Sequence, residues 1–202
     1  LLRAARISTR PDCLDEVVLA RVRHFGVGTV ELGGQSMDDE VLRRARRGHT
    51  AQQSLAAVRR LQLAGFVVGV QLMPGLPGET LASAWLGAQR VLAEQPQLLR
   101  IYPTVVLQGT ALGRLWQQGE YQPLSLEQAA QITLAIKLLA EEQGTAVIRM
   151  GLQPSPDLAA AVLAGRYHPA FGEMVQGLFW GFRVLAALRE MRQAPVLLVG
   201  GR

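Results

Sequence analysis

The chain has 202 residues, of which 49% are hydrophobic and 18% are charged. This balance is typical of a globular protein and excludes long disordered stretches, and the length suffices for one domain with its own core. No apolar run is long enough to span a bilayer, and no signal-peptide pattern follows Leu1, so we expect a cytoplasmic protein without a membrane partner. The single cysteine, Cys13, excludes a disulfide framework and a metal site of several thiolates built by this chain alone.

The net charge is +5, and the positive charge is almost all arginine because Lys137 is the only lysine. One interpretation is a set of solvated helix faces. The other is a polyanionic partner such as RNA, which clustered basic charge attracts without regard to sequence. The densest cluster consists of Arg43, Arg44, Arg46 and Arg47.

The first part of the chain predicts alternating strands and helices. A strand at 6–8 is followed by a helix that ends at Gly26. The apolar positions of this helix are Leu14, Val17, Val18, Val22 and Phe25. A strand at 28–33 comes next, and a capping box at 36–39 is expected to open a short helix that ends near Arg46.

A second capping box at 50–53 predicts a helix that Gly65 ends. The near-continuous apolar run at 66–73 is typical of a parallel strand buried on both faces. After a tight loop at 74–78, a helix runs until Pro96 breaks it, and a strand follows at 98–102.

The last part begins with a capping box at 125–128, which opens another helix. A strand is predicted at 145–150 and two helices after it, the second from about Phe171 to Met191. A terminal strand is expected at 195–199. Strands and helices that alternate in this way predict an α/β fold, with a parallel sheet and right-handed crossovers.

Three of the loops that follow strands are rich in Gly, Pro and polar residues, and they lie at 8–12, 33–39 and 73–80. In barrels and open α/β sheets, ligands bind at the carboxyl ends of the strands. These three loops are therefore the predicted site.

The same loops carry a family resemblance. The motifs, in order, are ISTRPD at 7–12, ELGGQSMDD at 31–39, RRGHT at 46–50, MPGLPGET at 73–80 and IYPTVVLQGT at 101–110. Together they resemble the radical S-adenosylmethionine (SAM) proteins related to the catalytic subunit of elongator. More distantly, they resemble oxygen-independent coproporphyrinogen III oxidase. The resemblance covers roughly residues 6–120, and the segment 165–173 resembles a C-terminal signature of an uncharacterised bacterial branch.

The resemblance implies a partial (β/α) TIM-like barrel in which a C-x3-C-x2-C loop holds a [4Fe-4S] cluster. At that cluster SAM is cleaved to a 5′-deoxyadenosyl radical, which abstracts hydrogen from the substrate. This chain has no such loop, and Cys13 lies elsewhere. We therefore expect a C-terminal fragment of a radical SAM enzyme, inactive by itself, with the cluster present in the full-length protein only. Nothing in the chain resembles the acetyltransferase domain of elongator.

The resemblance also implies four SAM-binding residues. Gln35 stands where the family places a polar contact to SAM, and Arg47, twelve residues later, matches an arginine that pairs with the SAM carboxylate. Ser8 and Gln71 occupy positions where acidic side chains bind the ribose, so both depart from the usual residue. For Gln35 the alternative is a loop amide that satisfies backbone groups, and for Arg47 it is a solvated face.

Two other side chains leave alternatives open. Glu31 is an acid in a buried strand and needs a cationic partner, for which Arg10 or another nearby arginine is expected. Tyr102 is either a ring beside the adenine or a core residue.

We expect a single domain over 1–202, with barrel units at about 6–120 and a C-terminal extension at about 121–202. The alternative function is a basic RNA- or tRNA-binding module without radical chemistry, and a third reading is an inert scaffold. An unpaired parallel edge left by missing units invites association, so an oligomer is expected.

Overall fold

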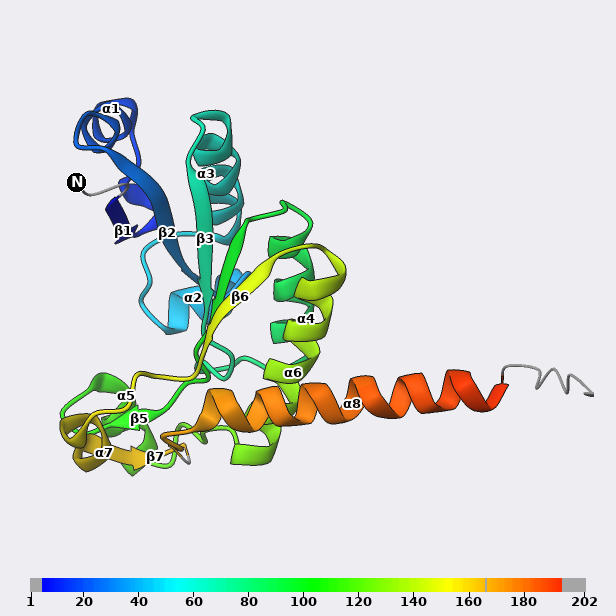
Figure 1. The fold of residues 1–202 in the computed structure, drawn as a ribbon. Helices are drawn as coiled ribbons and strands as arrows, with labels where there is room; N and C mark the ends of the chain where they lie inside the picture. Colours follow the sequence, from blue (N-terminus) through cyan, green and yellow to red (C-terminus); the bar gives the residue numbers. More distant parts are fainter. Residues whose placement is uncertain (1–4, 166, 194–202) are drawn as a thin grey trace, which may run out of the picture.

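Five parallel strands form the central sheet of the computed structural model, which describes residues 5–165 and 167–193 (Figure 1). The strands are β1 (Ala5–Thr9), β2 (Val27–Gln35), β3 (Val67–Leu72), β4 (Leu98–Ile101) and β6 (Ala146–Met150). Their spatial order, β1-β2-β3-β4-β6, follows the order along the chain, as repeated right-handed crossovers require. The predicted α/β fold with a parallel sheet flanked by helices is confirmed. The sheet continues past residue 120, where the C-terminal extension was expected to begin.

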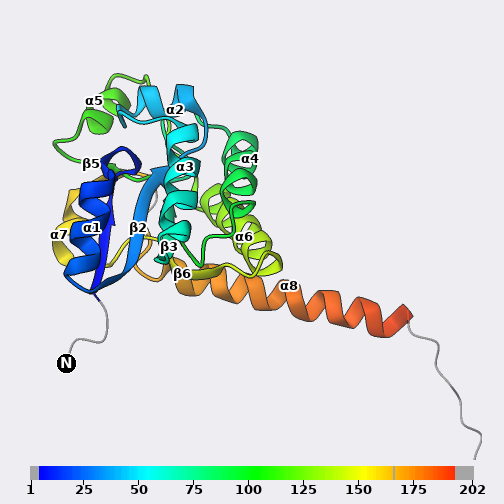
Figure 2. The ribbon, with the colours of Figure 1, turned by 90° about the horizontal axis from the view of Figure 1, so that it is seen from above.

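Helices cover one face of the sheet, as seen from above in Figure 2. They are α1 (Glu16–His24), α2 (Asp39–Arg44), α3 (Ala51–Leu63), α4 (Leu81–Leu92) and α6 (Leu126–Glu142). Side chains alternate along a strand, so every second residue points to these helices. In β2 these residues are Val30 and Leu32, both buried, whereas Glu31 between them points to the opposite, open face.

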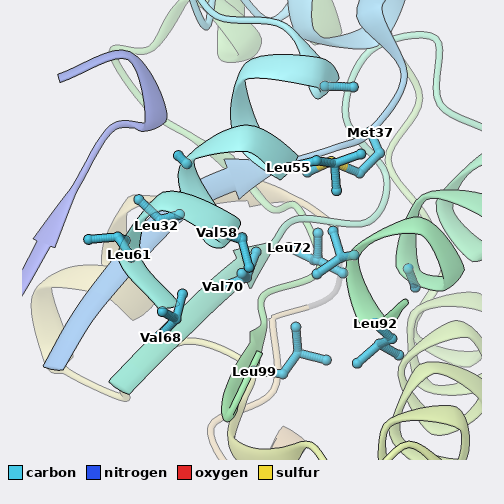
Figure 3. Close-up of a cluster of buried hydrophobic side chains, with 14 of the residues drawn as sticks. Leu32, Met37, Leu55, Val58, Leu61, Val68, Val70, Leu72, Leu92 and Leu99 are labelled. Atoms are coloured by element: carbon cyan, nitrogen blue, oxygen red, sulfur yellow. The ribbon is translucent and has the colours of Figure 1, made fainter. Parts of the chain in front are cut away.

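The core lies between the sheet and these helices (Figure 3). Leu55, Val58 and Leu61 form one stripe of α3 and pack on the strands, as their helical spacing predicts. The predicted capping boxes at Thr50 and Ser125 are both present, and the stop at Gly65 has a φ of 79°.

Two predictions about helix starts are wrong. The capping box at 36–39 does not form, because Asp38 caps α2 by accepting from the N–H groups of Glu40 and Val41. Ser36 donates a hydrogen bond to Glu79 instead.

The helix predicted to include Leu14 begins two residues later, at Glu16. A 3-10 turn at Pro11–Cys13 comes first, and Asp15 then caps α1. Leu14 is buried and Val18 and Val22 pack against the core as expected. Leu19 is buried as well, whereas Val17 and Phe25, both expected inside, are exposed.

A second, two-stranded antiparallel sheet pairs β5 (Val106–Leu107) with β7 (Val162–Ala164). With α5 (Ala111–Gln117) and α7 (Pro156–Ala161) it lies near the carboxyl ends of the large sheet (Figure 1). The last described helix is α8 (Phe171–Gln193), close to the predicted bounds. The strand predicted at 195–199 lies outside the described residues.

Leucines two positions apart on α3 provide a test of this packing. Leu61 is fully buried and Leu63 is 90% exposed. We expect Leu61→Ala to lower the free energy of unfolding by about 2–5 kcal/mol because it leaves a cavity in the core. Leu63→Ala should change it by no more than about 0.5 kcal/mol. Urea unfolding followed by circular dichroism measures both, and equal losses would contradict this arrangement of α3.

Candidate functional site

The loops at the carboxyl edge of the sheet are joined to one another by backbone hydrogen bonds. The N–H of Met73 donates to the carbonyl of Gln35 at 2.8 Å, and the N–H of Thr104 donates to the carbonyl of Pro74 at 2.8 Å. Thr104 is itself buried. These bonds continue the strand order beyond the ends of the strands, so the loops after β2, β3 and β4 form one connected edge.

Gln35 and Gln71 meet at this edge. The Nε2 of Gln71 donates to the Oε1 of Gln35 at 3.1 Å. Gln35 is 5% exposed and has a φ of 65°, a left-handed conformation that is uncommon for a residue other than glycine. Residues held in this region cluster at functional sites. Arg46 and Gln95 share this conformation, so the backbone angle by itself leaves both interpretations of Gln35 open.

Gly33 makes room for the side chains around it. A β-carbon at Gly33 would lie 2.7 Å from the Nε2 of Gln35 and 3.6 Å from the Nη2 of Arg47. Any larger residue would have to displace the Gln35 amide. The structure thus brings together three of the four predicted site residues: Gln35, Arg47 and Gln71.

Arg47 is only partly compensated. Its Nε is buried and has no hydrogen-bond partner within the described part of the chain. Burial lowers the pKa of Arg47, and the nearby positive charge of Arg10 lowers it further. Arg10 itself is held by Asp12, to which its Nε donates at 2.9 Å. A bound carboxylate would pair with Arg47 and relieve both effects.

Ser8 lies apart from this group. It is exposed on β1, opposite Glu31 in the strand register. Gln35 is four residues further along β2, roughly 13 Å at the rise of a parallel strand. Within the described residues, Ser8 makes no side-chain hydrogen bond to the other three.

Glu31 lies at the centre of the open face, and its cationic partners are arginines, as expected, but not Arg10. Its Oε1 is 2.9 Å from the Nη1 of Arg6 and accepts from the Nη2 of Arg100 at 3.0 Å, whereas Arg10 binds Asp12. The second carboxylate oxygen lies 2.8 Å from the Nε of Arg100, without the alignment of a hydrogen bond. The buried carboxylate is therefore compensated from both sides.

Gly69 of β3 lets this ion pair cross the sheet. A β-carbon at Gly69 would lie 2.9 Å from the Cγ of Glu31. Beyond it, the Nη1 of Arg100 donates to the hydroxyl of Tyr102 at 3.1 Å. Tyr102 thus joins the polar cluster formed by Arg6, Glu31 and Arg100 on the open face. In β4, Arg100 lies between the buried Leu99 and Ile101 and therefore points to the open face. This alternation was the only sequence feature that could have indicated Arg100 as a partner of Glu31.

Glu79, in the MPGLPGET loop, joins this loop to the loop after β2 and was not singled out from the sequence. Its Oε1 accepts from the hydroxyl of Ser36 at 2.6 Å, and its Oε2 accepts from the N–H of Gly75 at 2.9 Å. Tyr121, after α5, donates to the carbonyl of Gly75 at 2.5 Å. Burial raises the pKa of Glu79, although the hydrogen bond from Ser36 opposes this shift. These hydrogen bonds of Glu79, which we call the Glu79 clasp, hold the Gly75 loop beside the loop that contains Gln35 and Ser36.

The arginine cluster at 43–47 is not one continuous basic patch. Glu40 accepts from Arg43 at 2.7 and 2.6 Å and from Arg44 at 2.8 Å. These hydrogen bonds lower the pKa of Glu40 to about 2. Within the described residues neither Arg46 nor Arg47 forms an ion pair; Arg46 is exposed, whereas Arg47 is partly buried beside Gly33.

The described residues contain no group of three or more His, Cys, Asp or Glu side chains arranged to hold a metal ion. Cys13 is free and exposed. His49 is buried, with its Nε2 3.3 Å from the carbonyl of Gly34. None of the described helices is long and apolar enough to cross a membrane.

The sequence is similar to known protein families and to curated proteins. The family model for the Radical SAM superfamily matches residues 3–85, and that for the Radical_SAM C-terminal domain matches residues 96–179. The tRNA uridine(34) acetyltransferase of Methanocaldococcus infernus is 33% identical over 129 residues, which cover 62% of this chain and 24% of the relative. The chain thus spans about a quarter of the length of such curated relatives.

Two solved structures have the same fold. The archaeal Methanocaldococcus infernus Elp3 with an N-terminal deletion matches with a TM-score of 0.78 and 29% identity, covering 88% of this chain and 42% of that one. The coproporphyrinogen III oxidase of Escherichia coli matches with a TM-score of 0.58 and 21% identity, covering 70% and 32%. Both likenesses support the partial TIM-barrel fold.

The Glu79 clasp makes a pH-dependent contribution that can be measured. Its raised pKa means that the folded state takes up a proton more readily than the unfolded chain, so ionised Glu79 destabilises the folded state at neutral pH. Glu79→Gln keeps an acceptor for Gly75 and a donor for Ser36 without the charge. We expect this variant to be the more stable protein at pH 7, with an advantage that shrinks as the pH falls through the pKa of Glu79. A stability difference that is constant with pH would contradict the assignment.

Proposed function

This chain belongs to the radical SAM superfamily, and from that premise we propose that it forms the wall of the barrel that binds SAM in a radical SAM enzyme. The observation that carries the proposal is the convergence of Gln35, Gln71 and Arg47 around Gly33. The elements that supply them end at the carboxyl edge of a parallel sheet, where α/β proteins bind ligands.

The residues present fit SAM. The unpartnered Nε of Arg47 and the positive charge of Arg10 nearby suit the carboxylate of the methionine part. The amides of Gln35 and Gln71 can each donate to and accept from ribose hydroxyls. Ser8, apart from the group and opposite Glu31, would reach SAM only on another side.

The residues present do not fit an iron-sulfur cluster. Cys13 is the only thiol of the chain, and the described residues hold no cluster of metal ligands. We therefore propose that the cysteines for a [4Fe-4S] cluster come from sequence outside these 202 residues. When bound beside such a cluster, SAM supplies a 5′-deoxyadenosyl radical for hydrogen abstraction.

The side chains of this chain would act by binding and orientation. Arg47 would fix the carboxylate of SAM, and the amide pair would fix its ribose. The Glu79 clasp would hold the Gly75 loop against that ligand, because it joins the loop to Ser36 next to Gln35. This division of roles leaves the chemistry to the cofactor and its position to the protein.

A second candidate function is RNA binding. It is supported by the name of the relative, a tRNA uridine(34) acetyltransferase, and by the net charge of +5. The pairing of Arg43 and Arg44 with Glu40 reduces the charge that the 43–47 cluster offers to phosphates. Acetyl transfer is not proposed, because nothing in this sequence resembles an acetyltransferase domain.

Adjacent arginines test the SAM proposal. Arg47→Gln should weaken SAM binding by the chain about 10- to 100-fold, since hydrogen bonds to a charged group contribute about 1.5–3 kcal/mol. The matched control is Arg46→Gln, which removes an exposed guanidinium one residue away and should leave the affinity unchanged. Isothermal titration calorimetry measures both. An equal loss in the two variants, or no binding by the parent chain, would count against the proposed site.

The same pair of variants separates RNA binding from SAM binding. If the chain binds tRNA, its affinity should fall steeply with added salt, and Arg46→Gln should reduce the slope of log K against log salt by about 1 if Arg46 contacts a phosphate. Fluorescence anisotropy with labelled tRNA measures the slope. No detectable binding at low salt would remove this second candidate while leaving the first intact.

A further inference from the structure

Helix α8 leaves the body of the protein with an apolar surface uncovered. Both views show its first turns beside α6 and the rest of the helix extending into space (Figures 1 and 2). Phe171, Val175 and Phe179 are buried, and these residues, spaced by four, face the body. Arg183, 3.9 Å from Glu141, is the last described residue of α8 that forms an ion pair with α6.

The opposite side of α8 is exposed and apolar. Five large apolar side chains that point away from the body are each roughly half exposed: Leu178, Trp180, Val184, Leu185 and Leu188. Phe182, also about half exposed, lines the groove toward α6 instead. The five lie within about three helical turns, so the patch they form is on the order of 500 Å², at the upper end of what monomers expose. Such a patch indicates an interaction surface.

On the side of α8 that points away from the body, the side chains along one stripe increase in size toward the C-terminal end. Gly177, Gly181, Val184 and Leu188 follow one another at spacings of four, three and four, which places them along one stripe. A β-carbon at either glycine would meet no atom within 4 Å. The stripe is therefore thin in its first half and thick in its second half.

From this graded stripe and the apolar residues beside it, we propose that α8 pairs with the α8 of a second copy of this chain, in antiparallel orientation. In that orientation Gly181 of each helix meets Leu188 of the other, and the two copies of Val184 lie side by side at the two-fold axis. A parallel pair would set glycine against glycine and leucine against leucine, which leaves voids at one end and crowding at the other.

Two further features favour this partner. Antiparallel helix dipoles attract each other, which favours this orientation over a parallel pair. Two such patches together bury on the order of 1,000 Å², which reaches the size of a specific interface.

The helix itself gains from the partner. Glycine in a helix interior is less favourable than alanine, and an unsupported helix in water is marginal. Packing against a second copy would stabilise the outer half of α8, which α6 supports only at its inner end. This surface is separate from the sheet edge at which association was predicted from the sequence, and it does not depend on SAM binding.

Neighbouring residues on different sides of α8 test the proposal. Leu188→Glu places a charge in the interface, whereas Ala187→Glu places the same charge one residue away on the side facing α6, where Ala187 lines a groove with Leu138. Sedimentation equilibrium of the whole chain across the micromolar range should give twice the 21.9 kDa of one copy for the parent and for Ala187→Glu. Leu188→Glu should raise the dimer dissociation constant about 10-fold or more.

Cross-linking tests the orientation. With the exposed Cys13 replaced by serine, Val184→Cys should form a disulfide-linked dimer, because position 184 lies next to the two-fold axis. Leu178→Cys should not, because the two copies of position 178 would lie roughly 20 Å apart. Linkage at both positions would overturn the antiparallel pair. A monomeric parent chain, including one that binds lipid vesicles instead, would overturn the dimer, as would equal weakening by Ala187→Glu and Leu188→Glu.

Discussion

The buried carboxylate of Glu31 is the interaction on which the open face of the sheet depends. It forms ion pairs with Arg6 on β1 and with Arg100 on β4. The pair with Arg100 spans β3 at Gly69, where there is no side chain in the way. A carboxylate buried without a partner would be strongly destabilising, so these strands are constrained to positions from which both arginines reach it. Two residues beyond Gly69 on the same face, Gln71 then meets Gln35. The ion pair thus aligns the strands whose ends form the candidate site.

At the carboxyl edge beyond this ion pair, the candidate site depends on a missing side chain as well as on hydrogen bonds. Gly33 leaves the space in which the amide of Gln35 and the guanidinium of Arg47 approach each other. Glu79 and Tyr121 hold the neighbouring Gly75 loop from two sides. Arg47 is partly buried at this edge, and its Nε has no hydrogen-bond partner within the described residues, which supports the proposal that it binds a carboxylate.

Local signals in the sequence predicted much of the fold. The strand runs and the boxes at Thr50 and Ser125 act through neighbouring residues, and the structure has them as expected. Errors arose where distant contacts decide the outcome. Ser36 binds Glu79, 43 residues away, instead of capping a helix. An arginine partner was expected for Glu31, but the sequence did not identify Arg100, which lies 69 residues away. The strands β5 and β7 have two and three residues, too few for periodicity to register.

The grouping of site residues was predictable only through the family resemblance, because no pattern along the chain indicates that Gln35 and Gln71 touch. The most direct test of the central claim is a nitrogen-15 NMR titration of the chain with SAM. It should shift the Nε–Hε signal of Arg47 and the side-chain amide signals of Gln35 and Gln71 together, with one saturation curve. Saturable binding that leaves these three signals unmoved would contradict the account.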